Sequence, residues 1–574
     1  MKDKNITIAS LLYRYSPKLL AFSVGLGAFS GALYALIIPL VLNGIGNSSS
    51  QVNEPASKGM GEVLLGAVSQ NGAAVFFALV ILIFLTKASS VILVNNIAKS
   101  AAAELKISVV KKINNMSLQN VENAGFSRLL NVLIDDVNQV VGAAVTIPML
   151  VVSSVTVVGM LGYLASLNVY IFLVVLASII VGVVIFQAPV SASQGLYEKS
   201  RKIKDDIQEG IRGLIFGAYE LKLDKKKSDA YIEHEIVTPQ NKSVRLEKFG
   251  DAILHLAGNS SDLLALSIIG CVVFVLPQYE IFPAAQNYGV VMALLYIAGP
   301  VASILSMLQQ LKMGQVSITR IHQLAQYEEE VVDQNDVMSD AIRTVQTLRV
   351  KDLHYRYPGY EQDRDFSVGP ITLSFSRGQI SFIVGGNGSG KSTLSKMLSL
   401  HYRPSKGQVY FDNVAVNEKT ISAARERISV IFSNYYLFSR LYHQHSGLDQ
   451  EKINHYLDGL GLKGKTAYVD GRFTTTKLSD GQRRRLALLI ALFEDRDIYI
   501  FDEWAADQDP LFKRLFYREI LPDMKRNNKL VIVITHDDRY FECADRVIFM
   551  EDGKVIAVKD QSTMNMSQED VSAI

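Results

Sequence analysis

The stretch Gly385-Gly386-Asn387-Gly388-Ser389-Gly390-Lys391-Ser392 decides how the rest of this chain is interpreted. It fits the pattern G-x-x-x-x-G-K-[ST], in which glycines let backbone N–H groups turn toward phosphate oxygens. The apolar run 380–384 before it predicts a β-strand, and the residues from Thr393 onward predict a helix whose N-terminus adds a positive dipole. We therefore predict a phosphate site formed by these residues, with Lys391 on the β- and γ-phosphates and the Ser392 hydroxyl on Mg²⁺.

A second motif is the apolar run 498–501, which predicts a strand and ends in two carboxylates, Asp502 and Glu503. At a strand tip, Asp502 suits a ligand that reaches Mg²⁺ through water, and Glu503 suits a catalytic base or a group that positions the attacking water. The alternative is a strand followed by a solvated acidic turn. The phosphate loop in the same chain favours the catalytic interpretation.

The composition limits the class of protein. Of the 574 residues, 49% are hydrophobic and 20% are charged, whereas a soluble domain carries about 25% charged residues. This composition excludes a disordered or collagen-like chain. Two cysteines, Cys271 and Cys543, are too few for a disulfide framework or a cysteine-built zinc site. The net charge of +2 gives no reason to expect a nucleic-acid partner.

The apolar residues are concentrated before the phosphate loop. A bilayer-spanning helix needs about 20 apolar residues, and we predict six such spans, over residues 19–42, 73–96, 140–165, 168–188, 252–277 and 287–308. Lys and Arg are frequent in segments 1–18, 97–139 and 189–251 and sparse in the other connections, which predicts a cytoplasmic N-terminus and C-terminal part. The alternative, six buried helices of a soluble protein, predicts no such alternation. We expect an α-helical membrane domain over 1–330 and an α/β P-loop domain over 331–574.

A third motif separates this domain from other phosphate-loop proteins. Leu478-Ser479-Asp480-Gly481-Gln482 resembles the LSGGQ signature of ATP-binding cassette (ABC) proteins, with Asp480 in place of the first glycine. Ser479, the Gly481 N–H and the N-terminus of the following helix form a second anion site, next to Gln482. The resemblance implies that this site binds the γ-phosphate of ATP held by an opposite subunit. A homodimer with two ATP molecules is therefore the implied state.

The resemblance assigns further residues to the ATP site. Tyr357 stands where the family has an aromatic residue that stacks on adenine, and Tyr355 is the second candidate. His536 matches the family's switch histidine, which contacts the γ-phosphate, and would act with Glu503 in catalysis. Asp507 matches the loop that crosses the dimer interface.

One position departs from the family pattern. The family has a glutamine after the strand 428–432, where it bridges Mg²⁺ and the membrane domain, but this chain has Ser433 followed by Asn434. Neither side chain has the reach of glutamine. Whether Ser433 or Asn434 contacts the metal or its water stays open, and coupling to the membrane domain is expected to use other contacts.

The whole chain resembles a half-size ABC exporter of the type IV fold. Residues 475–487, 502–510 and 536–541 resemble the bacterial cyclic-peptide and siderophore exporter subfamily, with pyoverdine-, syringomycin- and microcin-exporting members. This resemblance implies ATP and Mg²⁺ as cofactors, the bacterial inner membrane as location, and export of a peptide-like solute across the lipid bilayer by alternating access. Two alternatives are a lipid or lipopeptide flippase of the same architecture and an ATP-gated channel or sensor.

Two charged residues lie inside the predicted spans. Lys87 and Asp262 interrupt apolar runs, and ionisable residues within a membrane are functional candidates by default. One interpretation is that both extend to the cytoplasmic interface. The alternative that we carry forward is that Lys87 and Asp262 line a substrate cavity and contact a polar solute.

Overall fold

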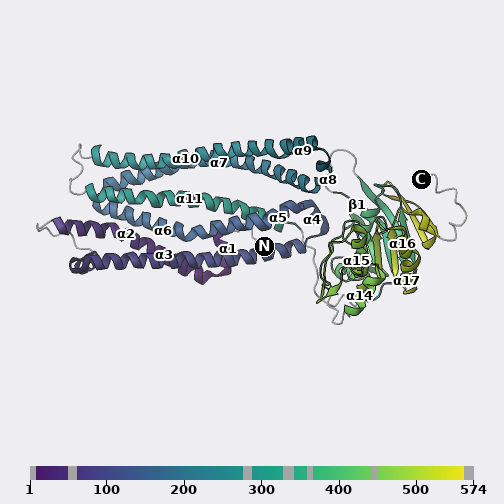
Figure 1. The fold of residues 1–574 in the computed structure, drawn as a ribbon. Helices are drawn as coiled ribbons and strands as arrows, with labels where there is room; N and C mark the ends of the chain where they lie inside the picture. The colour runs from purple at the N-terminus through teal and green to yellow at the C-terminus, as the bar shows by residue number, and fades with distance from the viewer. Residues whose placement is uncertain are drawn as a thin grey trace. The chain divides into compact units, whose positions relative to one another are not determined.

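The computed structural model describes residues 8–49, 61–275, 287–327, 342–357, 366–442 and 450–560. By its internal contacts the chain divides into two compact units (Figure 1). The membrane unit comprises Met1–Lys111 and Ser127–Gln326, and the nucleotide unit comprises Lys112–Phe126 and Tyr327–Ile574. The short segment Lys112–Phe126 thus groups with the C-terminal unit although it belongs in sequence to the helical part.

The membrane unit is built from long helices. They are α1 (Ile8–Tyr15), α2 (Pro17–Ser49), α3 (Gly61–Asn114), α5 (Phe126–Asn131), η1 (Val132–Asp136), α6 (Val137–Leu167), α7 (Val169–Phe216), α8 (Ala218–Leu223), α9 (Lys225–Tyr231), η2 (Ile232–Val237), α10 (Thr238–Gly270), η3 (Cys271–Val275) and α11 (Asn287–Ala325). Helix α10 packs along α7, and α2 and α11 pack along α6 (Figure 1). This arrangement confirms the predicted helical membrane domain.

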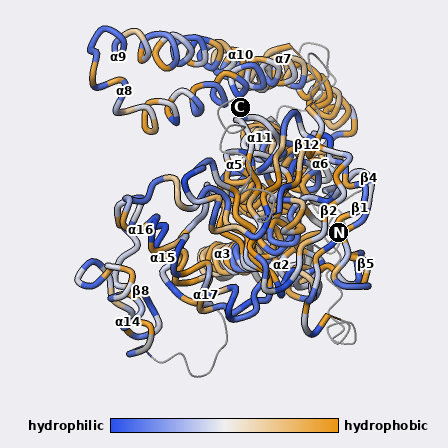
Figure 2. The backbone as a smooth tube through the Cα atoms, turned by 90° about the vertical axis from the view of Figure 1, so that its right-hand side faces the viewer, coloured by the Kyte–Doolittle hydropathy of each residue, from blue (hydrophilic) through white to orange (hydrophobic). Residues whose placement is uncertain are grey.

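Within the described residues, five helices are long and apolar enough to cross a membrane. They are Pro17–Val41, Ala73–Asn114, Phe126–Leu167, Val169–Phe216 and Gly289–Leu324. The predicted stretch 252–277 falls on α10 and η3, where Leu266–Val275 is apolar but shorter, and it ends outside the described residues. Hydrophobic residues follow α7 and α10 in Figure 2. Side chains such as Phe84, Ile180 and Val184 are largely exposed, which suits a lipid surface better than water.

The nucleotide unit contains two main sheets. Its strands are β1 (Thr347–Arg356), β2 (Ser367–Ser376), β3 (Ile380–Val384), β4 (Lys406–Phe411), β5 (Val414–Ala415), β6 (Ile428–Ile431), β7 (Tyr468–Val469), β8 (Arg472–Phe473), β9 (Ile498–Asp502), β10 (Leu530–Ile534), β11 (Arg546–Glu551) and β12 (Lys554–Asp560). The larger sheet has the order β12-β11-β3-β10-β9-β6 and is parallel except for β12. The second sheet is antiparallel, in the order β2-β1-β4-β5.

Helices complete this unit. They are α4 (Leu118–Ala124), α12 (Lys391–Leu398), α13 (Ile421–Arg425), α14 (Gln450–Gly459), α15 (Asp480–Phe493), α16 (Pro510–Leu515), η7 (Phe516–Ile520), α17 (Leu521–Arg526) and η8 (Asp538–Cys543). Every residue of β3, β9 and β10 is buried. Continuous apolar runs of this kind are typical of parallel strands that are covered on both faces.

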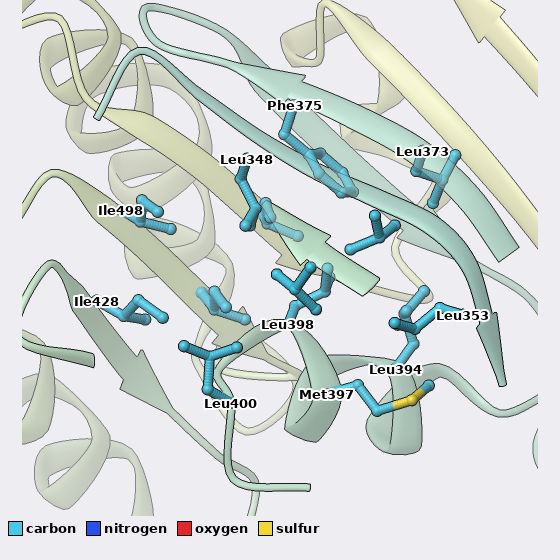
Figure 3. Packing of buried hydrophobic residues seen from close by; sticks show 14 of the residues in the cluster. Leu348, Leu353, Leu373, Phe375, Leu394, Met397, Leu398, Leu400, Ile428 and Ile498 are labelled. Carbon is cyan, nitrogen blue, oxygen red and sulfur yellow. The ribbon is translucent and has the colours of Figure 1, made fainter. Parts of the chain in front are cut away.

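Alternate residues of the central strands enter two different cores. Ile498 and Ile500 of β9 pack with β1, β2 and α12, and Figure 3 shows part of this cluster around Leu348 and Leu398. Tyr499 and Phe501 point to the opposite face, where they meet α15 and η7. The two cores fix β3, β9 and β10 side by side, so their carboxyl ends form one edge at which ligands of α/β proteins bind.

Candidate functional site

The predicted phosphate loop connects β3 to α12, as its mechanism requires. Gly385, Gly388 and Gly390 have φ angles of 155°, 81° and 96°, in a region that favours glycine. A Cβ on Gly385 would lie 2.1 Å from the Met550 carbonyl oxygen. Gly390 is the N-cap of α12, so the loop leads directly into the helix dipole.

Two side chains of the loop, those of Lys391 and Ser389, are positioned to bind phosphate. Lys391 is buried and donates to the carbonyl oxygens of Gly385 and Gly386 at 2.9 and 2.8 Å. Burial lowers the pKa of Lys391, whereas the nearby charges of Glu503 and Asp502 oppose that shift. The Ser389 hydroxyl is buried without a hydrogen-bond partner among the described residues. A buried polar group of this kind is satisfied when an anion enters the loop.

The carboxylate pair lies at the end of β9, beside β10. Asp502 is 2% exposed, and its Oδ1 lies 3.5 Å from the Ser392 Oγ. Burial, followed by the charge of Glu503, raises the pKa of Asp502 to about 6. A cation between Asp502 and Ser392 would stabilise the ionised carboxylate, because an opposite charge favours the charged form.

Glu503 and His536 are brought together across the ends of β9 and β10. His536 Nε2 lies 2.8 Å from Glu503 Oε1, and both residues line a pocket with Thr535 and Asp537. Glu503 has a φ of 53°, an uncommon value for a residue with a side chain. Its carbonyl oxygen accepts a hydrogen bond from Arg484, which holds the backbone in place. The two predicted catalytic residues are therefore adjacent and accessible.

The signature segment starts α15. The Ser479 N–H donates to Gln482 Oε1 at 3.3 Å, and the Asp480 side chain extends into solvent, 3.8 Å from Arg483. Gln508 Nε2 donates to the Gly481 carbonyl at 3.0 Å, next to Asp507 in sequence. Among the described residues, no hydrogen bond joins Ser479, Gly481 or Gln482 to the phosphate loop of the same chain.

The two candidates for the adenine contact, Tyr355 and Tyr357, lie in different surroundings. Tyr355 is 2% exposed, and its ring stacks on Tyr402 at 4.8 Å between centroids, so its faces are not open to a base. Tyr357 is half-buried at the end of β1, and its hydroxyl lies 2.9 Å from the Thr393 Oγ1. Tyr357 is thus the more accessible of the two rings, and its contact with adenine stays a prediction.

Asp507 and Ser433 lie near the site but in different settings. Asp507 pairs with Arg484, the residue that holds the Glu503 carbonyl. Ser433 and Asn434 are exposed in a turn just after β6, at the same edge of the sheet as Asp502. Neither makes a hydrogen bond among the described residues.

Comparisons with known proteins identify the architecture. Residues 368–506 match the family model for "ABC transporter", and residues 21–209 match "ABC transporter transmembrane region". The chain is 32% identical to the ATP-binding protein SyrD of Pseudomonas syringae pv. syringae over an alignment of 569 residues. This alignment covers 96% of each chain. The chain belongs to the ABC transporter family. It combines the helical membrane region and the ATPase region of an exporter in one polypeptide.

Other relatives align with smaller parts of this ABC transporter. The nisin transport ATP-binding protein NisT of Lactococcus lactis subsp. lactis is 32% identical over 36% of this chain and 37% of its own. The ATP-dependent lipid A-core flippase of Chromohalobacter salexigens is 29% identical over 36% and 37%. A solved structure of a bacterial Atm1-family ABC exporter with ATP bound has a TM-score of 0.74 with 15% identity, covering 96% of both chains. That likeness shows the exporter fold.

In the membrane unit, Lys87 of α3 lies over the Tyr34 ring of α2, with its Nζ 5.3 Å from the ring centroid. Tyr34 in turn meets Tyr296 of α11 at 6.5 Å between centroids. All three residues are half-buried. Among the described residues, no carboxylate lies within ion-pair distance of Lys87. Asp262 lies on α10, but its side chain is outside the described residues.

Sequence reasoning missed two features of the site. Arg484 contacts both the Glu503 carbonyl and Asp507, and thereby ties the signature helix to the catalytic strand. Its place within the basic run 483–485 was the only available signal. Tyr402 stacks on Tyr355 of β1, and nothing in the sequence around Tyr402 marks this contact.

Proposed function

We propose that this ABC transporter exports a peptide-like solute, such as a cyclic peptide, a lasso- or microcin-type peptide or a peptidic siderophore, by alternating access. The observation that carries the proposal is the alignment to SyrD over 96% of both chains, together with the subfamily resemblance of residues 475–487 and 502–510. NisT, named for nisin transport, adds a relative with a peptide in its name.

In this proposal the nucleotide unit binds ATP and Mg²⁺. The residues fit both groups, since the Ser389 hydroxyl is buried without a partner in the described region and the glycine conformations open the loop to phosphate. Ser392, and Asp502 through water, would hold Mg²⁺, which neutralises phosphate charge when bound. Lys391 binds the phosphates. Glu503 accepts the proton of the attacking water, while His536 holds the Glu503 carboxylate and approaches the γ-phosphate.

A homodimer would complete the site. The signature residues Ser479, Gly481 and Gln482 would contact ATP bound by the second subunit, and Asp507 would lie at the interface. Two exposed apolar surfaces support a second copy. Tyr436, Phe438 and Tyr442 line a groove of the nucleotide unit.

The second surface lies at the end of α7 and on α8, where Phe216, Tyr219 and Leu223 are all more than three-quarters exposed. Contiguous exposed apolar side chains mark interaction sites. We propose that this end of one copy docks in the aromatic groove of the other. Size-exclusion chromatography with light scattering tests this: Tyr219→Ser with Leu223→Ser should convert dimer to monomer.

We place the transporter in the bacterial inner membrane, with the N-terminus and the nucleotide unit in the cytoplasm. The support is the excess of Lys and Arg in segments 1–18, 97–139 and 189–251. Within the membrane unit we propose Lys87 as a substrate contact and keep Asp262 as a second candidate. Lys87 lies over the Tyr34 ring, and Tyr34 in turn meets Tyr296, so the two rings supply aromatic surface for a peptide.

The export proposal is tested in inside-out proteoliposomes. ATP should drive uphill uptake of a labelled cyclic peptide or peptidic siderophore from a panel, whereas the Glu503→Gln variant should show none. A labelled lipid moved between leaflets in place of any peptide would instead support the flippase. ATP hydrolysis with downhill flux alone would support a gated channel.

A further inference from the structure

Helix α4 contacts the ATP-binding core through one carboxylate. Glu122 accepts a hydrogen bond from Lys396 Nζ at 3.0 Å through its Oε1 and from the Tyr402 hydroxyl through its Oε2. Lys396 lies on α12, the helix that follows the phosphate loop. Helix α4 follows α3 closely in the chain and leads into α5. The backbone therefore joins it to two membrane-spanning segments, one before it and one after it.

Tyr402 connects Glu122 to the buried core of the nucleotide unit. It is 3% exposed, and its ring stacks on Tyr355 at 4.8 Å with an interplanar angle of 19°. Lys396 also reaches the Tyr402 hydroxyl at 3.0 Å and lies 4.7 Å from the ring centroid. Burial, followed by the hydrogen bond to Glu122, raises the pKa of Tyr402, so its hydroxyl stays a donor. Glu122 therefore fixes both the hydroxyl and the cation over the ring.

The proposed adenine residue, Tyr357, completes the chain of contacts. Its ring packs edge-on against Tyr355 at 5.0 Å and against Tyr402 at 6.2 Å. Its hydroxyl lies 2.9 Å from Thr393 Oγ1, one residue beyond Ser392. The three tyrosine rings thus form one packed cluster with Glu122 at one end and the base-contacting ring at the other. Each ring restricts the next, because aromatic rings in a packed core have few alternative rotamers.

We infer that Glu122 and Tyr402 are positioning residues that link adenine binding at Tyr357 to the docking of α4. The inference rests on the proposed role of Tyr357. When α4 is docked, the carboxylate orders Tyr402 and Lys396, and the rings hold Tyr357 ready to stack on the base. By linkage, adenine that binds an ordered Tyr357 favours the docked position of α4 by the same factor. The contact of Glu122 with Tyr402 and Lys396 would couple nucleotide binding to the membrane helices that flank α4. Such a route suits a transporter in which Ser433 stands at the glutamine position and lacks the reach of that side chain.

The test separates base recognition from phosphate binding. The affinities of the full-length protein for ATP and for inorganic tripolyphosphate are measured by calorimetry in EDTA, where hydrolysis does not proceed. Glu122→Gln and Tyr402→Phe should each weaken ATP about tenfold, the loss expected for a hydrogen bond to a charged group, and leave tripolyphosphate unchanged. The double variant should resemble either single one, because both remove the same link. Glu418→Gln, which removes an exposed carboxylate paired with Arg403, should bind both ligands normally.

A second measurement follows α4 itself. Hydrogen exchange of the α4 amides should slow with ATP but not with tripolyphosphate, and Tyr402→Phe should abolish the difference. Equal weakening of both ligands would mean general damage to the phosphate loop and would overturn the inference, as would unchanged ATP affinity in both variants. The variant Tyr357→Ala tests the adenine role of Tyr357 separately from the link to α4. If it fails to weaken ATP relative to tripolyphosphate, the adenine role of Tyr357 is wrong; if it succeeds while Glu122→Gln and Tyr402→Phe have no effect, only the link fails.

Discussion

The substitution Glu503→Gln tests the catalytic assignment with little structural disturbance. Glutamine has nearly the same volume, and its amide oxygen can still accept from His536 Nε2, which lies 2.8 Å from Glu503 Oε1. The backbone contacts remain, because Arg484 donates to the carbonyl and the Glu503 N–H donates to the Ile534 carbonyl at 3.1 Å. The substitution removes only the carboxylate, which is the group that would accept a proton. The free energy of unfolding should therefore change by less than about 1 kcal/mol.

The expected loss of ATPase activity follows from the role of a general base. Such a group contributes about 10²–10⁴ in rate, equivalent to about 3–5 kcal/mol of transition-state stabilisation. The measurement is steady-state phosphate release by the purified transporter, with ATP affinity determined in parallel and expected to be unchanged. Glu519→Gln, an exposed carboxylate on η7, serves as the matched control and should retain full activity. Hydrolysis by Glu503→Gln within about threefold of the wild type would refute the assignment.

Three further predictions concern the loop, the metal site and the membrane unit. Gly385→Ala should lower stability by about 1–3 kcal/mol and abolish ATP binding, because its Cβ would lie 2.1 Å from the Met550 oxygen, whereas Gly386→Ala, with no atom within 4 Å, should keep its melting temperature. The pKa of Asp502 is about 6 in the folded protein, above its unfolded value, so the contribution of Asp502 to stability without nucleotide should fall as pH rises from about 4 to 6. In thermal melts, Asp502→Asn should remove this pH dependence. The same variant should also lose stabilisation by Mg²⁺-ATP. Lys87→Ala should reduce transport of the peptide substrate at least tenfold without changing basal ATPase, and Lys99→Ala, an exposed lysine on the same helix, should transport normally; equal transport by both variants would remove Lys87 from the substrate site.

Much of the nucleotide unit could be predicted because its chemistry is local in sequence. The glycine spacing of 385–390 sets the loop, since only glycine tolerates the observed φ angles next to the Met550 carbonyl. Asp502 and Glu503 follow a fully apolar strand, and such a strand is buried in the centre of a sheet. Their placement beside His536 then follows from parallel pairing of β9 with β10.

The choice between Tyr355 and Tyr357 shows where sequence reasoning stops. Tyr355 lies in β1 and Tyr357 directly follows the last residue of that strand, so alternation in the sequence predicts the same side for both rings. Only the position of Tyr402, which is set by packing against α12, covers Tyr355 and leaves Tyr357 accessible. The docking of α4 is similar, because Glu122 is one of four acidic residues in the helical segment 97–139 and nothing in the sequence distinguishes it. A pairing with Lys396, 274 residues away, has no local signal.

The neighbouring carboxylates show how the fold assigns different chemistry to identical groups. Asp502 ends a central strand and is buried, so its ionised form is unfavourable until a cation arrives. Glu503 follows with a positive φ that turns the chain away from the strand, and its side chain is one-third exposed, within reach of His536 and the pocket. The proposed metal ligand, Asp502, has to be held rigidly, whereas the proposed proton acceptor, Glu503, has to face the reacting water. The positive φ of Glu503 separates the two proposed roles, so replacing Glu503 by a residue that disfavours this φ is expected to disturb metal binding as well as catalysis.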